Sequence, residues 1–210
     1  YYDNAVIRIY NIPIFYLPKL SHPDPTVNRR SGFLIPSFSD TKNLGSSLSL
    51  PYYWAIKEDK DLTINNRLFF SENPLFTGEY RQVFKDSNFV ADFGFTEGYK
   101  KNSSNKKTGD KSHFFAKFIK KFEKENTESN LEINVQHVSN DKYLKLYKVD
   151  SNLVDYEKDN LENYIDFSHF NDKENFFFAL KASSFETLKE DYNDKYEFIL
   201  PHITLNKNLF

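Results

Sequence analysis

The chain has no cysteine and no methionine, and only six glycines and one tryptophan among its 210 residues. Without cysteine it can form no disulfide framework and no thiolate metal site, and it has no cysteine nucleophile. No segment approaches the roughly 18 consecutive apolar residues that a membrane-spanning helix needs. These absences exclude disulfide-stapled proteins and helical membrane proteins. They leave membrane-spanning strands open, because such strands alternate between apolar and polar residues.

Charge and motifs exclude further classes. The 28 basic and 30 acidic side chains give a formal net charge of −2, whereas nucleic-acid binders usually carry a clear basic surplus. The five histidines show no H-x-x-x-H or H-E-x-x-H spacing, and there is no G-x-S-x-G elbow, phosphate loop or dinucleotide fingerprint. We therefore expect no catalytic residues, no metal site, no cofactor and no nucleic-acid partner. The sequence predicts that the protein is not an enzyme.

Aromatic side chains in alternation are the dominant feature. With 22 phenylalanines and 14 tyrosines the chain is 18% aromatic, and many aromatics in a polar background favour strands over a conventional globular core. Apolar and polar residues alternate with a period of two between clusters of turn-forming residues, which predicts antiparallel strands. The clearest such segments are 48–56, 62–70, 76–84, 89–96, 131–136 and 176–183.

Strand and loop lengths point to an outer-membrane β-barrel. A strand over 48–56 would be about 30 Å long and, tilted by ~45°, about 21 Å high, close to the apolar belt of roughly 25 Å in such barrels. Pro51–Trp54 places aromatics near a strand end, where interfacial girdles lie. Segments 57–60 and 71–74 read as short turns, and Lys100–Ser112 as a long basic loop. The predicted fold class is all-β, an antiparallel barrel segment that is incomplete.

The two ends of the chain differ from its middle. In residues 1–20 apolar side chains fall on both faces, as in a strand that is buried on both sides or lines an apolar channel. The polar, proline-rich stretch 21–30 that follows predicts a linker. The chain opens and stops within strand patterns, so we expect an internal piece of a longer protein. The expected domains are 1–20, the linker 21–30, and a barrel part over 31–210.

Several motifs resemble the LptD family of outer-membrane LPS-assembly proteins, also called OstA or Imp. Residues 13–54 carry P-x-F-Y-L-P, S-H-P-D-P-T-V, R-x-S-G-F-L-x-P and L-P-Y-Y-W in order. Segments 61–81 and 194–208 resemble later strands of the family, whereas 100–175 matches only in strand rhythm. The resemblance implies that 1–20 is the last strand of a periplasmic β-jelly roll and that 31–210 is the first part of the barrel.

The resemblance also implies a function. Proteins of this family receive lipopolysaccharide (LPS) from the periplasm and insert it into the outer leaflet through a lateral gate in the barrel. Their partners are LPS, outer-membrane lipid, an LptE-like plug lipoprotein and an LptA-like periplasmic bridge protein. The expected location is the outer membrane of a Gram-negative cell, with the N-terminal part in the periplasm. Two alternatives stay open: another outer-membrane barrel of porin type, and a soluble β-sandwich that acts on polysaccharide.

Pro36 and Pro51 each stand within a strand pattern, although proline cannot donate a hydrogen bond to a β-ladder. An unpaired carbonyl costs several kcal/mol in hydrocarbon, so two such residues in consecutive strands would loosen a seam at the start of the barrel. The resemblance places the lateral gate there. The alternative is that both prolines lie at strand ends or bulges, as in many soluble sheets.

Two further residue sets follow from the same reading. One set would line the jelly-roll groove and contact acyl chains, with ordinary sheet core as the alternative: Ile7, Ile9, Ile12, Ile14 and Phe15. The other set would face the barrel lumen, where polar groups meet sugars, phosphates or water, with a solvated wall as the alternative: Arg67, Glu79, Arg81, Asp92, Glu132 and Asn134.

Overall fold

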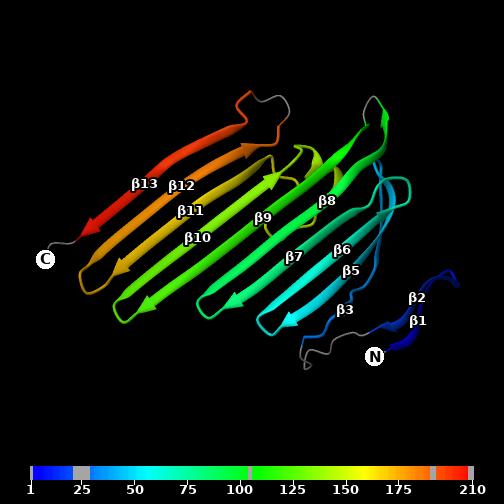
Figure 1. Cartoon of the computed structure of the whole chain (residues 1–210), viewed down its shortest axis with the longest axis horizontal. Coiled ribbons are helices and arrows are strands. Elements are labelled where there is room, and N and C mark those ends of the chain that lie inside the picture. The colour runs from blue at the N-terminus through cyan, green and yellow to red at the C-terminus, as the bar shows by residue number, and fades with distance from the viewer. Residues whose placement is uncertain (1, 21–28, 104–105, 190–192, 208–210) are drawn as a thin grey trace.

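Antiparallel pairing between strands that are consecutive in the chain builds almost the whole structure (Figure 1). The computed structural model describes residues 2–20, 29–103, 106–189 and 193–207. One sheet holds two strands, β1 (Tyr2–Ile9) and β2 (Ile12–Leu20), and the other holds eleven. The strands of the large sheet are β3 (Gly32–Phe33), β4 (Ser37–Thr41), β5 (Gly45–Lys57), β6 (Lys60–Phe69), β7 (Leu75–Phe84), β8 (Ser87–Ser103), β9 (Lys106–Lys124), β10 (Thr127–Val138), β11 (Asn160–Asn171), β12 (Phe176–Thr187) and β13 (Tyr196–Lys207).

The large sheet is an open layer in which strand order follows chain order from β3 to β13, with β4 also paired to β5. It does not close into a barrel, and β13 and the β3/β4 strand form its two edges. The all-β antiparallel class is therefore confirmed. The turns 57–60, 84–87 and 124–127 lie at one end of the sheet, because the strands that lead into them, β5, β7 and β9, run in the same direction. The longest connection, residues 139–159, lies at the other end.

Residues 1–20 were expected to form one strand, and that expectation is wrong. The structure shows a two-stranded hairpin in which Ile9 pairs with Ile12. Tyr10 and Asn11 between them have φ values of 48° and 63°. Positive φ at both central residues defines the two-residue turn whose twist matches that of the strands it joins. The small Asn side chain tolerates this conformation, and the apolar run therefore folds back at Tyr10.

The predicted basic loop Lys100–Ser112 is also wrong. β8 continues to Ser103 and β9 begins at Lys106, so most of the segment is an extension of a hairpin. β10 ends where Val138 pairs with His113, so β9 residues before His113 have only β8 beside them. A two-stranded ribbon that extends beyond the rest of the sheet needs no regular apolar alternation, and its sequence therefore looks like a loop.

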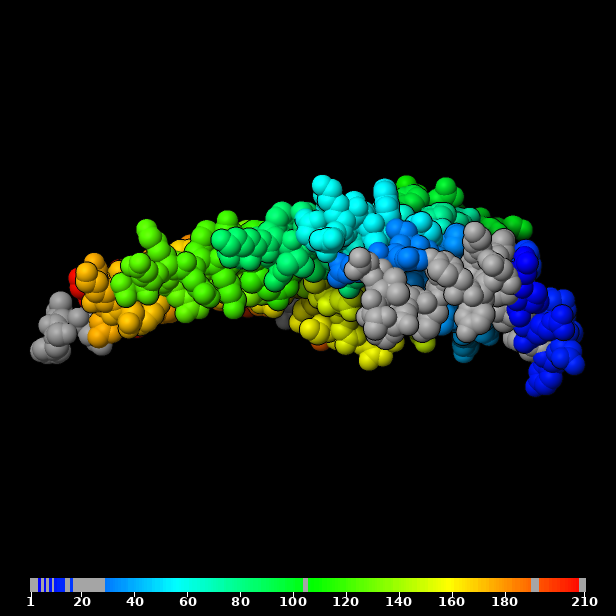
Figure 2. All heavy atoms as spheres, turned by 90° about the horizontal axis from the view of Figure 1, so that it is seen from below, coloured from blue at the N-terminus to red at the C-terminus, as the bar shows by residue number. Residues whose placement is uncertain are grey.

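One face of the large sheet carries an inserted segment. Residues 139–159 lead from β10 to β11 and include the helix α1 (Tyr143–Tyr147). Figure 2 shows this segment, in yellow, bulging from one face of a thin curved layer. The main hydrophobic cluster lies between the insert and the sheet, and joins Tyr143, Leu144 and Tyr147 to sheet residues such as Phe115 and Leu75. In the described ranges no helix has the length and hydropathy of a membrane span.

Candidate functional site

The face of the sheet opposite the insert is apolar and exposed. Side chains alternate along each strand, so cross-strand pairs such as Phe76↔Phe95 and Phe93↔Phe114 lie on one face. So many large apolar side chains exposed on one face are unusual for a soluble protein, and they indicate a surface that contacts lipid or another protein. The large exposed apolar side chains on this face are Trp54, Leu68, Phe76, Phe84, Phe93, Phe95, Phe114, Phe122, Val135 and Ile165.

The other face is polar. Glu79 pairs with Asp92 across β7 and β8, and Arg81 pairs with Asp61 across β7 and β6. With the alternation of side chains, these registers place the whole predicted lumen set on the face that carries the insert. The structure brings together on this face Arg67, Glu79, Arg81, Asp92, Glu132 and Asn134.

A charged cluster surrounds Asp61 at one side of this face. Arg81 Nε donates to Asp61 at 2.8 Å, and Arg29 Nη1 lies 3.1 Å from the same carboxylate. The Tyr53 hydroxyl donates to it at 3.3 Å. Asp61 is almost fully buried, and a buried carboxylate needs such compensation. Arg81 therefore has a protein partner at Nε, while 44% of its side chain remains exposed.

Glu132 and Asn134 lie at the β10 part of the same face. Glu132 accepts hydrogen bonds from Lys117, at 2.7 Å, and from the Tyr164 hydroxyl. Asn134 donates to the carbonyl of Glu162 at 2.6 Å. Both side chains therefore form hydrogen bonds with residues on neighbouring strands of the sheet.

The insert is docked by polar side chains as well as by its apolar cluster. Glu79 accepts a hydrogen bond of 2.6 Å from Asn152, and Arg67 donates to the Tyr147 carbonyl. Gln136 on β10 donates to the Leu153 carbonyl at 3.5 Å. Sequence reasoning did not detect this arrangement. Arg67, Glu79 and Asp92 were expected to line a lumen, and the insert covers them in part.

A buried hydrogen-bonded chain lies at the centre of the docking surface. His113 Nε2 lies 2.8 Å from Asp92 Oδ1, and His113 Nδ1 lies 3.0 Å from the Tyr143 hydroxyl. The imidazole of His113 therefore joins Asp92 on β8 to Tyr143 of the insert, through one ring nitrogen each. Burial, and after it the charge of Asp92, raises the pKa of Tyr143 above its usual value. The hydroxyl therefore keeps its proton.

Glycine makes room for this chain. A Cβ at Gly94 would lie 2.5 Å from Cε1 and 2.9 Å from Nδ1 of His113. Real Cβ atoms do not approach other atoms so closely, because packed interiors leave no such overlap. Gly94 therefore allows the imidazole to lie flat across the neighbouring strand, stacked on Phe115 with ring centroids 4.7 Å apart.

Pro36 lies at a bulge, and Pro51 faces it. Between Phe33↔Tyr52 and Ser37↔Ser49 the first strand takes one residue more than β5, which defines a β-bulge at Ile35–Pro36. The Leu34 N–H donates to the Pro51 carbonyl at 2.9 Å. The return bond that such a pair normally makes is absent, because Pro51 has no N–H. Pro36 thus lies outside the ladder and Pro51 within it.

The residues proposed for the jelly-roll groove are only partly described. Ile12 follows the turn of the β1–β2 hairpin and exposes 67% of its surface. The side chains of Ile7, Ile9, Ile14 and Phe15 lie outside the described residues. By register, Ile12 pairs with Ile9, and Arg8 lies on the opposite face of the hairpin.

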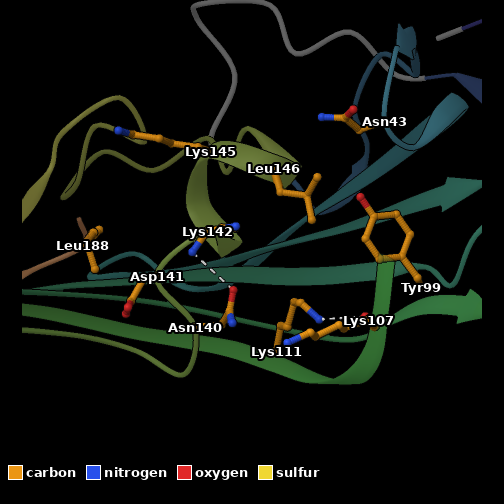
Figure 3. A pocket seen from close by; sticks show the side chains of 10 residues that line it. All are labelled: Asn43, Tyr99, Lys107, Lys111, Asn140, Asp141, Lys142, Lys145, Leu146 and Leu188. Carbon is orange, nitrogen blue, oxygen red and sulfur yellow. Dashed lines mark hydrogen bonds between the residues drawn. The ribbon is translucent and has the colours of Figure 1, made fainter. Parts of the chain in front are cut away.

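A basic cavity opens beside the insert at the end of the sheet that carries it (Figure 3). It has a volume of about 790 Å³ and is lined by residues from β8, β9, the β4–β5 turn and the insert. In the described part of the chain no group of three or more His, Cys, Asp and Glu side chains is arranged for a metal ion.

One protein family matches this chain over almost its whole length. The family model described as "LptD protein" matches residues 2–210. The chain belongs to the LptD family. Membership agrees with the expectation of a protein that is not an enzyme.

Individual relatives match shorter stretches. The LPS-assembly protein LptD of Nitrosococcus oceani is 39% identical over 85 residues, which cover 40% of this chain and 11% of the relative. The proteins of the same name from Methylococcus capsulatus and Chromobacterium violaceum are each 40% identical, over 79 and 83 residues. These stretches cover 38% and 40% of this chain, and 8% and 10% of the two relatives. The matched part therefore spans about a tenth of the length of such relatives.

Proposed function

We propose that the protein to which this chain belongs inserts LPS into the outer leaflet of the outer membrane. The observation that supports this proposal most directly is that one sheet has a continuous apolar face and an opposite polar face, in a chain of the LptD family. The relatives are named LPS-assembly proteins, and members of the family are outer-membrane proteins. The apolar face contacts lipid, and the polar face lines the interior.

The open edges of the sheet support a barrel that is larger than this chain. A sheet with unpaired edges exposes backbone groups, and in lipid these must be paired. β13 ends the sheet with apolar side chains such as Phe198, Leu200 and Ile203 largely exposed. Further strands from the same protein would pair with this edge and continue the apolar face.

The bulge at Pro36 supports a weakened seam as part of a lateral gate. The first strand lacks regular pairing over 34–36, and Pro51 removes the donor that would have restored it. Pro36 lies on the edge strand and Pro51 lies on β5 beside it, so both defects weaken the pairing of the edge strand. In the proposal this strand opens toward the last strand of the complete barrel, so the lipid part of LPS passes sideways into the membrane.

The β1–β2 hairpin and two partner proteins complete the proposed route of LPS. The β1–β2 hairpin ends a periplasmic jelly roll, and Ile7, Ile9, Ile12, Ile14 and Phe15 contact acyl chains there. An LptA-like bridge protein delivers LPS to the jelly roll, and an LptE-like lipoprotein plugs the barrel. The stretch 21–30, which lies largely outside the described residues, joins the two parts.

Depletion tests the proposal. The gene for the full-length protein is placed under a repressible promoter in its own organism. LPS at the cell surface is then measured with an outer-leaflet LPS-modifying enzyme supplied from outside. We expect newly made LPS to become inaccessible while inner-membrane LPS accumulates. Unchanged surface LPS after depletion contradicts the proposal, and a protein removed from membranes by carbonate would instead favour the soluble β-sandwich.

A further inference from the structure

The basic cavity has an unusual charge balance. Among its lining residues are Lys107, Lys111, Lys142 and Lys145 and a single acidic residue, Asp141. Asp141 is already engaged, because it pairs with Lys195 at 3.0 Å. Lys145 is engaged as well, because it pairs with Asp159, and Figure 3 shows its ammonium directed away from the other lysines.

Lys111 carries the argument, because its charge is buried. The residue exposes only 8% of its surface. Its ammonium donates to the carbonyls of Gly109, at 3.2 Å, and Lys107, at 3.4 Å. Within the described ranges no carboxylate lies within 4.0 Å of it. An ammonium has three donors, and a buried charge is costly unless a charge of opposite sign accompanies it.

The backbone at Gly98 leaves the space that the Lys111 ammonium occupies. Gly98 has a φ of 77°, and a Cβ there would lie 2.7 Å from Lys111 Nζ and 2.6 Å from the Gly109 carbonyl oxygen. The neighbouring Lys106 is neutralised separately, by Glu72 at 2.9 Å. Glu72 therefore compensates Lys106 and not Lys111, and among the described residues Asp110 attracts the Lys111 ammonium only from beyond ion-pair distance. A lysine held in this way differs from an ordinary surface lysine.

We propose that this cavity binds an anionic group of the phosphate class, with Lys111 as its central contact and Lys107 as a second contact. Ammonium groups bind phosphate as point charges. Asn43 and Asn140 line the same cavity, and their amides suit the hydroxyl groups of a phosphorylated sugar. That the anion is the phosphorylated sugar part of a glycolipid rests on the proposed function. The anion site itself rests only on the geometry.

Crosslinking in the full-length protein tests the site. A photoreactive amino acid at Asn43 is exposed to LPS purified from the same organism, and in parallel to the same LPS stripped of phosphate by hydrofluoric acid. We expect capture of intact LPS, and capture of stripped LPS weaker by at least about tenfold, as expected when charge-assisted hydrogen bonds are lost. Lys111→Gln should weaken capture of intact LPS to a similar extent.

Three further variants separate charge from folding. Lys107→Gln changes an exposed residue and should reduce capture without a folding cost. Gly98→Ala keeps every charge but displaces the Lys111 ammonium, so it should also reduce capture. Lys121→Gln removes the same charge from an exposed lysine at the other end of β9, and should leave capture unchanged.

Calorimetry with inorganic pyrophosphate distinguishes a lipid-borne phosphate from a free one. Pyrophosphate binding that Lys111→Gln abolishes, with LPS capture independent of Lys111, assigns the site to a free phosphate compound. If neither measurement responds to Lys111→Gln or Lys107→Gln, the proposal is overturned. Failure of the proposed function is separate, because it appears as unchanged surface LPS after depletion, whatever the cavity binds.

Discussion

Arg67 on β6 donates from Nη1 to the carbonyl oxygen of Tyr147, 2.6 Å away and 80 residues later in the chain. The same guanidinium reaches Ser39 on β4 at 2.9 Å and Ser47 on β5 at 3.1 Å, and it lies over the ring of Phe69. One side chain therefore ties the start of the sheet to a segment that enters between β10 and β11. The insert crosses the polar face and is fastened at its far side.

Replacing Arg67 by lysine should loosen the insert. Lysine keeps the charge, but it lacks the planar set of donors that serves three partners at once. We expect a loss of about 1–3 kcal/mol of local stability and faster hydrogen exchange at the amides of α1 and Val149. Arg29→Lys is the matched control, because Arg29 pairs with Asp61 at 3.1 Å. Equal exchange in both variants would contradict the fastening role.

Tyr143→Phe should undock the same segment from its centre. The change keeps the ring and removes the hydroxyl that is hydrogen-bonded to His113 Nδ1, which leaves a buried ring nitrogen unpaired at a cost of about 1–3 kcal/mol. We expect increased protease cleavage within residues 148–159. Tyr156→Phe is the control, since in the described part of the chain its hydroxyl has no hydrogen bond. Cleavage no faster than in that control would show that the chain of hydrogen bonds adds nothing to docking.

Glu72 should make stability depend on pH. Burial raises the pKa of this carboxyl group, but hydrogen bonds from Lys106 and the Lys100 N–H outweigh burial and lower it. A lowered pKa means that the ionised group stabilises the fold above the ordinary glutamate value of about 4.3. This contribution is lost as the pH falls through the lowered pKa.

The matching experiment compares urea unfolding of the full-length wild type and Glu72→Gln in lipid vesicles between pH 3 and pH 7. We expect a difference of about 1–2 kcal/mol at pH 7 that shrinks toward zero in acid. Glu125→Gln, in an exposed turn, should show no such trend. A Glu72→Gln difference that stays constant over the whole range would refute the assignment.

The seam prolines give a functional prediction. Pro36→Ala together with Pro51→Ala restores two backbone donors, one of them opposite Leu34, so pairing along the first strand should tighten. We expect less LPS at the surface of cells that carry the full-length double variant. Pro74→Ala, outside the strands, is the control. Normal surface LPS in a well-folded double variant would count against the gate.

Ile12 tests the hairpin. A photocrosslinker at this exposed position should capture LPS in cells if the hairpin belongs to a lipid-binding groove. Arg8, on the opposite face of the hairpin, provides the control position and should capture less. Absence of any LPS adduct from Ile7 to Phe15 would remove the groove from the proposal.

Alternation along the chain was enough to predict most strands. It found β5, β6, β7, β8, β10 and β12 because each buries or exposes alternate residues, whereas β13 was indicated by the resemblance of 194–208 to the family. It failed at the extension of β8 and β9, where residues 107–110 are exposed and have no reason to alternate. It also missed α1, which has five residues and owes its form to packing on the sheet rather than to helix propensity.

The centre of the docking surface could not be predicted. Asp92, His113 and Tyr143 come from two strands and an insert, so no local spacing joins them. Asp92 was placed on the correct side of its strand by alternation, but its partners depend on how 139–159 folds back. His113 carried one faint signal. It stands two residues before Phe115 on the same face of the strand, where a polar ring is unexpected.

The extra residue at Ile35–Pro36 has a consequence for orientation. Side chains in a strand reverse sides at every step, yet Phe33 and Phe38, five positions apart, both stand on the apolar face, against Tyr52 and Phe70. Deleting Ile35 or Pro36 would therefore do more than shorten the strand. Everything before the deletion would rotate by half a turn, so Phe33 would turn toward the polar face and Gly32 toward the apolar face.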